Sequence, residues 1–194
     1  MVLKSKGKLP RRKQIVEAAR KLVIKCGSEN VTVRRIADEV GISEAAIYRH
    51  FKSKKDILYL LIESIEASLL EDLDTVAYPQ YGKFENVILN HLSAVEKRKG
   101  VSFQVIAEII SLGDKKLNHR IYQTIENYIS RLKEILREEV DKGKLRSDLD
   151  VEAAALTLFS VVQGLSNIWT LSNYSFTPQE KLQPIMELLR QGMN

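Results

Sequence analysis

Side chains of the kind that recognise a phosphate or a base gather between positions 32 and 51. Two short predicted helices flank Gly41 there, and Ile47 and Phe51 are spaced to hold the second helix against a core. Its outward positions then carry charged, aromatic and small side chains, namely Glu44, Ala45, Tyr48 and Arg49. Two short helices around a tight turn can place the second helix in a DNA major groove, where small residues such as Ala45 and Ala46 approach base edges. The pattern predicts a helix-turn-helix.

The starts of the predicted helices supply a second set of hydrogen-bond donors. Thr32 and Ser43 stand at N-cap positions, and Ser53–Asp56 has the form of a capping box. Unpaired amides and a partial positive charge at helix starts attract phosphates. Lys54 and Lys55 would lie on a first helical turn, where a cation is unfavourable, so they indicate a phosphate nearby.

Charge is distributed unevenly along the chain. Residues 1–55 carry 15 basic and 5 acidic side chains, a net charge of +10, whereas the rest carries 15 and 20, a net charge of −5. This asymmetry favours a polyanion at the N-terminal end, although a solvated basic tail would look the same. The first basic run is either a flexible arm that adds salt-sensitive affinity or reaches the minor groove, or simply a solvated start: Lys4, Lys6, Lys8, Arg11, Arg12 and Lys13.

The sequence argues against an enzyme. The three histidines, at positions 50, 91 and 119, fall on different predicted elements, and no cluster has the spacing of a metal site, a nucleophile elbow or a phosphate-binding glycine loop. The single cysteine, Cys26, cannot form a disulfide within one chain. We expect no metal and no cofactor. The N-terminal residues lack the apolar stretch of a signal peptide, so a cytoplasmic protein is expected.

The apolar spacing is helical nearly throughout and predicts an all-α fold of about nine helices. The expected organisation is a flexible basic arm, a three-helix DNA-binding domain and a helical ligand-binding and dimerisation domain, at 1–10, 11–55 and 56–194. Pro184 either kinks the last helix or begins it. The uncharged stretch Ala153–Leu171 is about long enough to span a bilayer, but its polar residues and acidic flanks favour a helix buried in a protein, and no membrane contact is expected.

The run Val31–Leu58 resembles the DNA-binding domain of the TetR family, and the similarity extends over residues 11–62. Its most specific part is the series Tyr48, His50, Phe51, Ser53, Lys54 and Leu58. The resemblance implies phosphate contacts by Thr32, Tyr48, His50 and Lys54, a base contact by Arg34, and base reading by Glu44, Ala45 and Ala46. Arg49 would contact either a base or a phosphate. Glu44 would accept from a cytosine amino group or only favour the helix start.

The resemblance also implies a homodimeric repressor that binds a palindromic operator in double-stranded DNA and is released by a small molecule. The eighth helix, paired with the ninth, fits a four-helix dimer contact. The apolar candidates for that contact, which could equally be monomer core, are Leu158, Val161, Val162, Leu165, Trp169, Ile185, Met186 and Leu189.

A small hydrophobic effector, such as an acyl-CoA, a fatty acid or a drug-like molecule, is expected among the fourth to eighth helices, whose layout is similar to TetR-type regulators of fatty-acid metabolism. The candidate lining is Phe103, Ile106, Ile110, Tyr122, Ile125, Tyr128 and Phe159, with the polar residues His91, Gln163 and Asn167. His91 could instead be a satisfied core residue, and the two amides could serve the dimer interface. The alternative function is a nucleoid-associated DNA-binding protein that docks a protein partner without an effector.

Overall fold

The computed structural model describes residues 10–26, 30–74 and 82–193. Over these ranges the chain forms nine α-helices and no strand, which confirms the predicted fold class. The helices are α1 Arg11–Cys26, α2 Val33–Val40, α3 Glu44–Tyr48, α4 Lys54–Asp74, α5 Lys83–Lys97, α6 Val101–Leu112, α7 Lys115–Asp141, α8 Val151–Leu171 and α9 Pro178–Met193. Helix α9 begins at Pro178 and contains Pro184. Of the basic arm predicted at residues 1–10, all but Pro10 lies outside the described residues.

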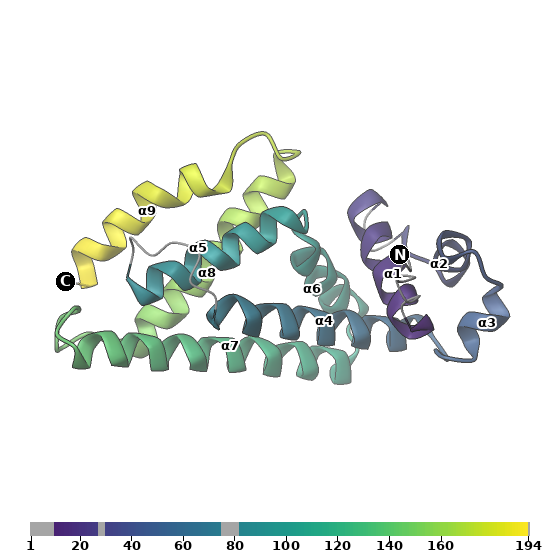
Figure 1. The fold of residues 1–194 in the computed structure, drawn as a ribbon, viewed down its shortest axis with the longest axis horizontal. Helices are drawn as coiled ribbons and strands as arrows, with labels where there is room; N and C mark the ends of the chain where they lie inside the picture. Colours follow the sequence, from purple (N-terminus) through teal and green to yellow (C-terminus); the bar gives the residue numbers. More distant parts are fainter. Residues whose placement is uncertain (1–9, 27–29, 75–81, 194) are drawn as a thin grey trace, which may run out of the picture.

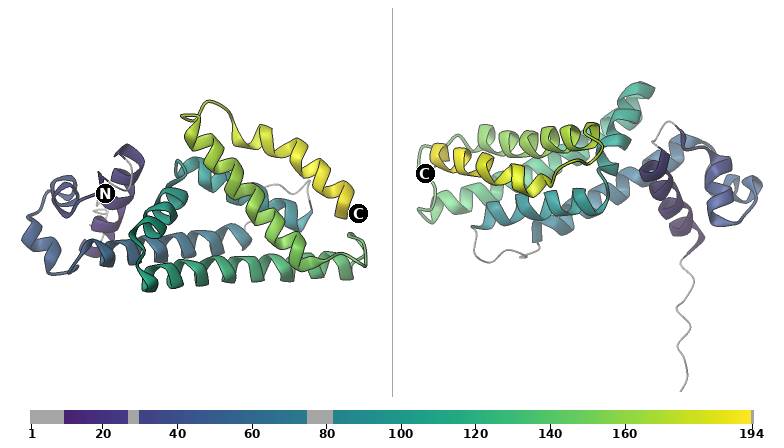
Figure 2. Two further views of the ribbon diagram at one scale, coloured as in Figure 1. Left: turned by 180° about the vertical axis from the view of Figure 1, so that it is seen from behind. Right: turned by 90° about the horizontal axis from the view of Figure 1, so that it is seen from above.

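The helices form a small unit and a larger bundle that share one helix. Helices α1, α2 and α3 lie at one end of the molecule, with α3 outermost (Figure 1). Helix α4 leaves this unit and runs alongside α7 into the bundle, where it also packs on α5 and α6. Helices α8 and α9 pack on each other and on α5 at the opposite end (Figure 2). The DNA-facing end predicted from the sequence is therefore attached to the bundle through α4 and through the packing of α1 on α6.

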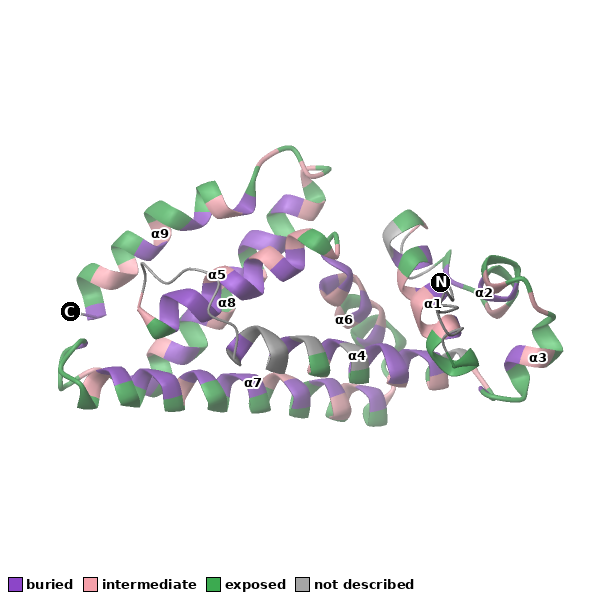
Figure 3. Cartoon of the chain, in the orientation of Figure 1, coloured by how far each residue is buried: buried purple, intermediate pink, exposed green. Residues whose placement is uncertain are grey.

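One hydrophobic core runs through both parts. It includes Ile15 and Ile36 in the small unit, continues through Ile57 and Ile62 on α4, and reaches Leu132 on α7. Buried positions line the inner sides of α4 and α5, whereas exposed positions follow the outer sides of α7 and α9 (Figure 3). Because α4 buries residues against both parts, its orientation is constrained from both sides.

Burial corrects several expectations about side chains in the bundle. Ile110 and Tyr122 are 66% and 59% exposed, so the prediction that they line an enclosed pocket is wrong. Asn167 is also exposed, so of its two predicted roles only a contact in the dimer interface remains. Five predicted interface residues are instead buried in the core of their own chain, because the same apolar spacing serves either purpose: Leu158, Val162, Leu165, Trp169 and Met186.

A buried polar pair lies inside the bundle. His91 on α5 and Tyr128 on α7 are joined by a hydrogen bond of 2.9 Å between Nδ1 and the hydroxyl, and their rings meet edge to face. The ring of Phe159 on α8 lies 6.0 Å from that of Tyr128. Burial, with the nearby charge of Arg98, lowers the pKa of His91 to about 4. His91 is therefore neutral at physiological pH.

This pKa predicts a pH dependence of stability. The unfolded chain binds the proton of His91 with a pKa near 6.5, whereas the folded chain resists it until the pH approaches 4. The free energy of unfolding should therefore fall as the pH is lowered from 6.5 to 4, by about 1.4 kcal/mol per pH unit from this group. Urea unfolding from pH 7 to 5 should show a shallower slope for His91→Asn than for the wild type. The exposed His119→Asn is the control, and equal slopes for all three proteins would contradict the prediction.

Candidate nucleic-acid interface

Local hydrogen bonds set the boundaries of α2. The hydroxyl of Thr32 accepts from the amide of Arg35 at 3.2 Å, as expected of an N-cap. At the other end Gly41 has φ 72° and donates its amide to Asp38. This left-handed conformation favours glycine, and it turns the chain sharply into α3. The predicted turn is confirmed.

Helix α3 is short and is held from one side. Ser43 caps it by accepting from the amide of Ala46 at 3.2 Å. Ile47 and Phe51 are buried beneath it, with 0% and 3% exposed. The helix ends at Tyr48, and in the turn that follows the amides of His50 and Phe51 both donate to the carbonyl of Ile47. The anchored side and the cap orient the remaining side of α3 toward solvent.

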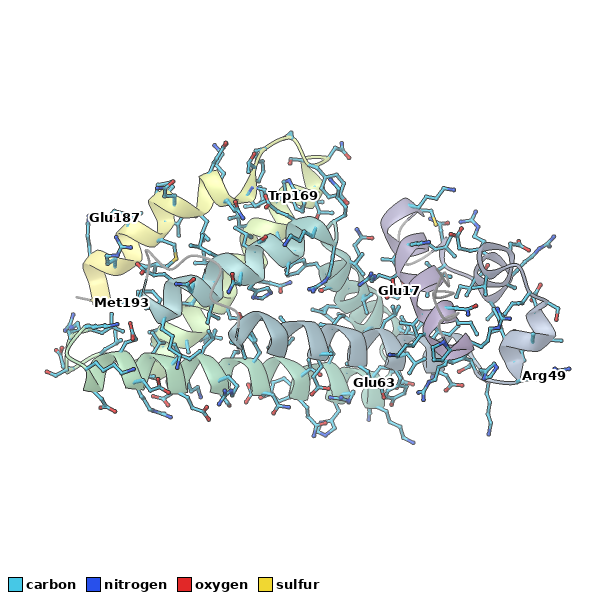
Figure 4. All side chains as sticks on the ribbon, in the orientation of Figure 1. Glu17, Arg49, Glu63, Trp169, Glu187 and Met193 are labelled. Carbon is cyan, nitrogen blue, oxygen red and sulfur yellow. The ribbon has the colours of Figure 1, made fainter. Side chains whose placement is uncertain are left out.

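The predicted contact residues lie on α2, on α3 and in the adjoining turns. Most of them are exposed: Thr32, Arg34, Ser43, Glu44, Ala45, Tyr48, Arg49 and His50. Ala46 is half-buried, and the side chain of Lys54 lies outside the described part. Arg49 projects from α3 at the outer end of the molecule (Figure 4). The neighbouring Arg35 has a structural role, since its guanidinium donates to the carbonyl of Asn30 at 3.1 Å.

At the start of α4, Asp56 makes the contact expected of the predicted capping box, whereas Lys55 differs from the expectation. The carboxylate of Asp56 accepts from the amides of Lys52 at 2.6 Å and Ser53 at 3.2 Å, so these two amides are already engaged. The ammonium of Lys55 lies 2.5 Å from the carboxylate of Asp114, which caps α7. The sequence pattern did not indicate Asp114, because the two residues are 59 positions apart.

A second candidate surface lies on α8. Leu156, Ile168 and Leu171 are 55%, 60% and 83% exposed, and Leu188 on α9 is 69% exposed. Among the described helices α8 alone is long and apolar enough to cross a membrane by length and composition, yet only 33% of its most apolar window is buried. Apart from the backbone of its own helix and its two chain neighbours, a Cβ added to Gly164 would meet no atom of the described residues within 4 Å. The sequence pattern did not separate these exposed residues from the buried ones on α8.

Within the part of the chain that the structure describes, no group of three or more His, Cys, Asp or Glu side chains could hold a metal ion. The geometry of the interface is that of hydrogen-bond donors and cations around an exposed helix. Such an arrangement can bind a phosphate backbone and base edges.

Comparison with known proteins agrees with this geometry. The family model of bacterial regulatory proteins of the tetR family matches residues 15–59, and that of the YsiA-like protein C-terminal region matches residues 51–192. The nucleoid occlusion factor SlmA of Marinomonas sp. (strain MWYL1) is 28% identical over 179 residues, 91% of each chain. SlmA of Pectobacterium carotovorum is 28% identical over 198 residues and the full length of both chains.

Solved structures share the fold. The transcriptional regulator FadR from Bacillus subtilis, in complex with stearoyl-CoA, superposes with a TM-score of 0.76 at 24% identity, covering 94% of this chain and 99% of FadR. FadR from Bacillus halodurans gives 0.76 at 21% identity, covering 95% and 96%. The YsiA-like model spans most of the chain, and the tetR model covers the helix-turn-helix. This chain therefore belongs to the TetR family and is a DNA-binding transcriptional regulator, not an enzyme.

Proposed function

We propose that this chain is a homodimeric, cytoplasmic repressor that binds a palindromic operator and leaves it when an apolar effector enters the bundle. The observation that carries the proposal is α3, which is capped by Ser43, anchored by Ile47 and Phe51, and otherwise open to solvent. In a dimer the two α3 helices would enter successive major grooves about 34–36 Å apart.

Exposure supports separate roles for the residues around α3. Tyr48, His50, Thr32 and Lys54 would contact phosphates and position the dimer on DNA. Arg34, on the first turn of α2, would reach a base. Glu44 and Ala45 on the open side of α3 would read base edges, while the half-buried Ala46 lets the helix approach them closely. Ser43 would place the start of α3 near a phosphate, and the projecting Arg49 would contact either a base or a phosphate.

Substitutions should distinguish the residues that contact phosphates from those that recognise bases. Tyr48→Ala should weaken binding by about tenfold on every DNA sequence, because a hydrogen bond to a charged phosphate is lost. Arg34→Ala should relax the preference at one base pair of each half-site by about 1–3 kcal/mol. Gel shifts on operator and random duplexes measure both effects. Tyr122→Ala, a similarly exposed tyrosine on α7, is the control. An equal loss on all sequences for Arg34→Ala would contradict its assigned role.

The exposed stripe of α8 supports the dimer. Leu156, Ser160, Gly164 and Ile168 recur every fourth residue, so they lie on one side of the helix. The small residues in the middle would allow a partner helix to approach closely, and none of the four side chains is charged. Between the start of α8 and the end of α9 lies an open groove of about 420 Å³, with Leu188 and Leu189 on one wall and the charged Arg146 and Asp148 at its edge. A second copy would cover this surface, giving a contact of four helices.

A charged side chain introduced on the exposed stripe of α8 should prevent dimerisation. Ile168→Lys would bury an unpaired ammonium in the dimer, so it should shift the protein to monomer at micromolar concentration. Ile110→Lys is the matched control, because Ile110 is 66% exposed on α6, away from the stripe. Sedimentation velocity measures the outcome. A wild type that sediments as a monomer at the same concentration would exclude α8 as the interface.

The interior of the bundle supports an apolar effector. The buried pair His91 and Tyr128 is neutral and lies beside Phe159, with the half-buried Ile106, Ile125 and Gln163 as further candidates. Phe103 belongs to a separate cluster with Val95 and Trp169. The structural similarity to FadR, whose complex contains stearoyl-CoA, makes a long-chain acyl-CoA the first effector to test.

An acyl-CoA effector gives a direct test. Stearoyl-CoA should release the protein from its operator at micromolar concentration, whereas coenzyme A without an acyl chain should not, because the apolar burial is missing. Tyr128→Phe should weaken this release about tenfold through loss of one buried hydrogen-bonding group. Fluorescence anisotropy of labelled operator measures the release. Equal release by coenzyme A alone would rule out recognition of the chain.

The similarity to nucleoid occlusion factors over nearly the whole chain favours a second candidate, a nucleoid-associated protein that docks a protein partner. Genome-wide occupancy separates the two. A few palindromic sites that lose the protein when effector is added favour the repressor, whereas many dispersed sites that do not respond favour the alternative.

A further inference from the structure

The starts of α4 and α7 lie side by side. The two helices run in the same direction from the end of the molecule that carries the helix-turn-helix (Figure 1). Two ion pairs join them: Lys55 with Asp114 at their first turns, and Glu66 with Arg120 farther along. The guanidinium of Arg120 also donates to the hydroxyl of Thr124 at 3.0 Å. The carboxylate of Asp114 is therefore held at a fixed place beside the DNA-facing end of α4.

Both oxygens of Asp114 are engaged. Oδ1 accepts from the amides of Lys116 and Leu117, each at 3.0 Å, and so caps α7. Oδ2 accepts from the ammonium of Lys55 at 2.5 Å. The hydrogen bond from Lys55, followed by that from Leu117, lowers the pKa of Asp114, so the group is an anion at neutral pH. Its side chain is 19% exposed, whereas that of Lys55 is 53% exposed and remains accessible from solvent.

The carboxylate of Asp114 supplies the negative charge beside Lys55 that a DNA phosphate would otherwise supply. A cation on the first turn of α4 is unfavourable for the helix dipole, and a negative group beside it offsets that cost. Within the protein Asp114 supplies the negative group. In the complex with DNA, a phosphate at the start of α4 would attract the same ammonium and would be repelled by the carboxylate.

We propose that Asp114 competes with a DNA phosphate for the ammonium group of Lys55 and thereby lowers the affinity for DNA. The inference rests on the proposed phosphate contact at the start of α4. Asp114 lies in the turn between α6 and α7, so a shift of that turn changes how far Lys55 is available to DNA. Asp114 is thus a positioning residue, which acts on DNA only through Lys55.

The test removes the charge and keeps the cap. Asn remains a good N-cap, so Asp114→Asn should preserve α7 while releasing Lys55. Each protomer would then neutralise about one more phosphate, which steepens the plot of log affinity against log salt by about 1.8 for a dimer. The gain in affinity over wild type should be about tenfold larger at 50 mM than at 200 mM salt. It should appear on random duplexes as well as on the operator, because phosphates carry no sequence information.

Two further variants test whether the gain in affinity of Asp114→Asn comes from Lys55. Adding Lys55→Gln to Asp114→Asn should remove the gain and restore the wild-type salt slope. Glu138→Gln removes the same charge from an exposed pair with Lys83 near the far end of α7, and it should leave the slope unchanged. Thermal unfolding checks that each protein is folded, and Asp114→Ser, which also caps without charge, replaces Asn if Asp114→Asn is unstable.

The outcomes are distinct from those of the proposed function. If folded Asp114→Asn binds DNA no more tightly than wild type, or the gain survives Lys55→Gln, the competition is overturned. If it binds more weakly, the pair holds Lys55 in place for DNA, which also overturns the proposal. A wild type that prefers no operator over random DNA would contradict the repressor alone, since the salt slopes on random duplexes still decide the role of Asp114.

Discussion

Helix α4 has to satisfy two packing surfaces at once, and the rest of the architecture depends on that requirement. Its buried residues Ile57 and Leu58, near the small unit, and Ile62 and Ile65, farther into the bundle, belong to one continuous core. A helix packed on both sides resists independent tilting, because close-packed interiors transmit a displacement from one partner to the next. The orientation of α3 relative to a second copy of the chain is therefore tied to the packing of α5, α6 and α7 around α4.

The polar groups of the bundle follow from the same packing. His91 and Tyr128 satisfy each other within an apolar interior, and the charged pairs between α4 and α7 lie nearer the surface, where water lowers the cost of burying ions. The surroundings of His91 and Tyr128 are therefore apolar, whereas the buried carboxylates of Glu85 and Glu139 are paired with Arg190 and Lys144.

The helix-turn-helix could be predicted in detail from the sequence because its determinants are local. Thr32 and Ser43 cap helices within three residues of themselves, Gly41 supplies a conformation that depends on its own φ, and Ile47 and Phe51 are spaced within one turn. The bundle was predictable only as a set of helices. On α8 the same apolar periodicity contains Val162, which is buried, and Ile168, which is exposed, and hydrophobicity alone does not distinguish them.

By itself the sequence determined the helical fold with about nine helices, the turn at Gly41, and a family membership carried by the run from Val31 to Leu58. Those properties rest on interactions between residues that are close in the chain. Only the tertiary structure decided that Ile110 and Tyr122 face solvent, that Trp169 belongs to its own core, and that Lys55 is paired with Asp114. Each of these depends on contacts between helices that are distant in sequence, and the spacing of residues along one helix does not specify which neighbour will cover it.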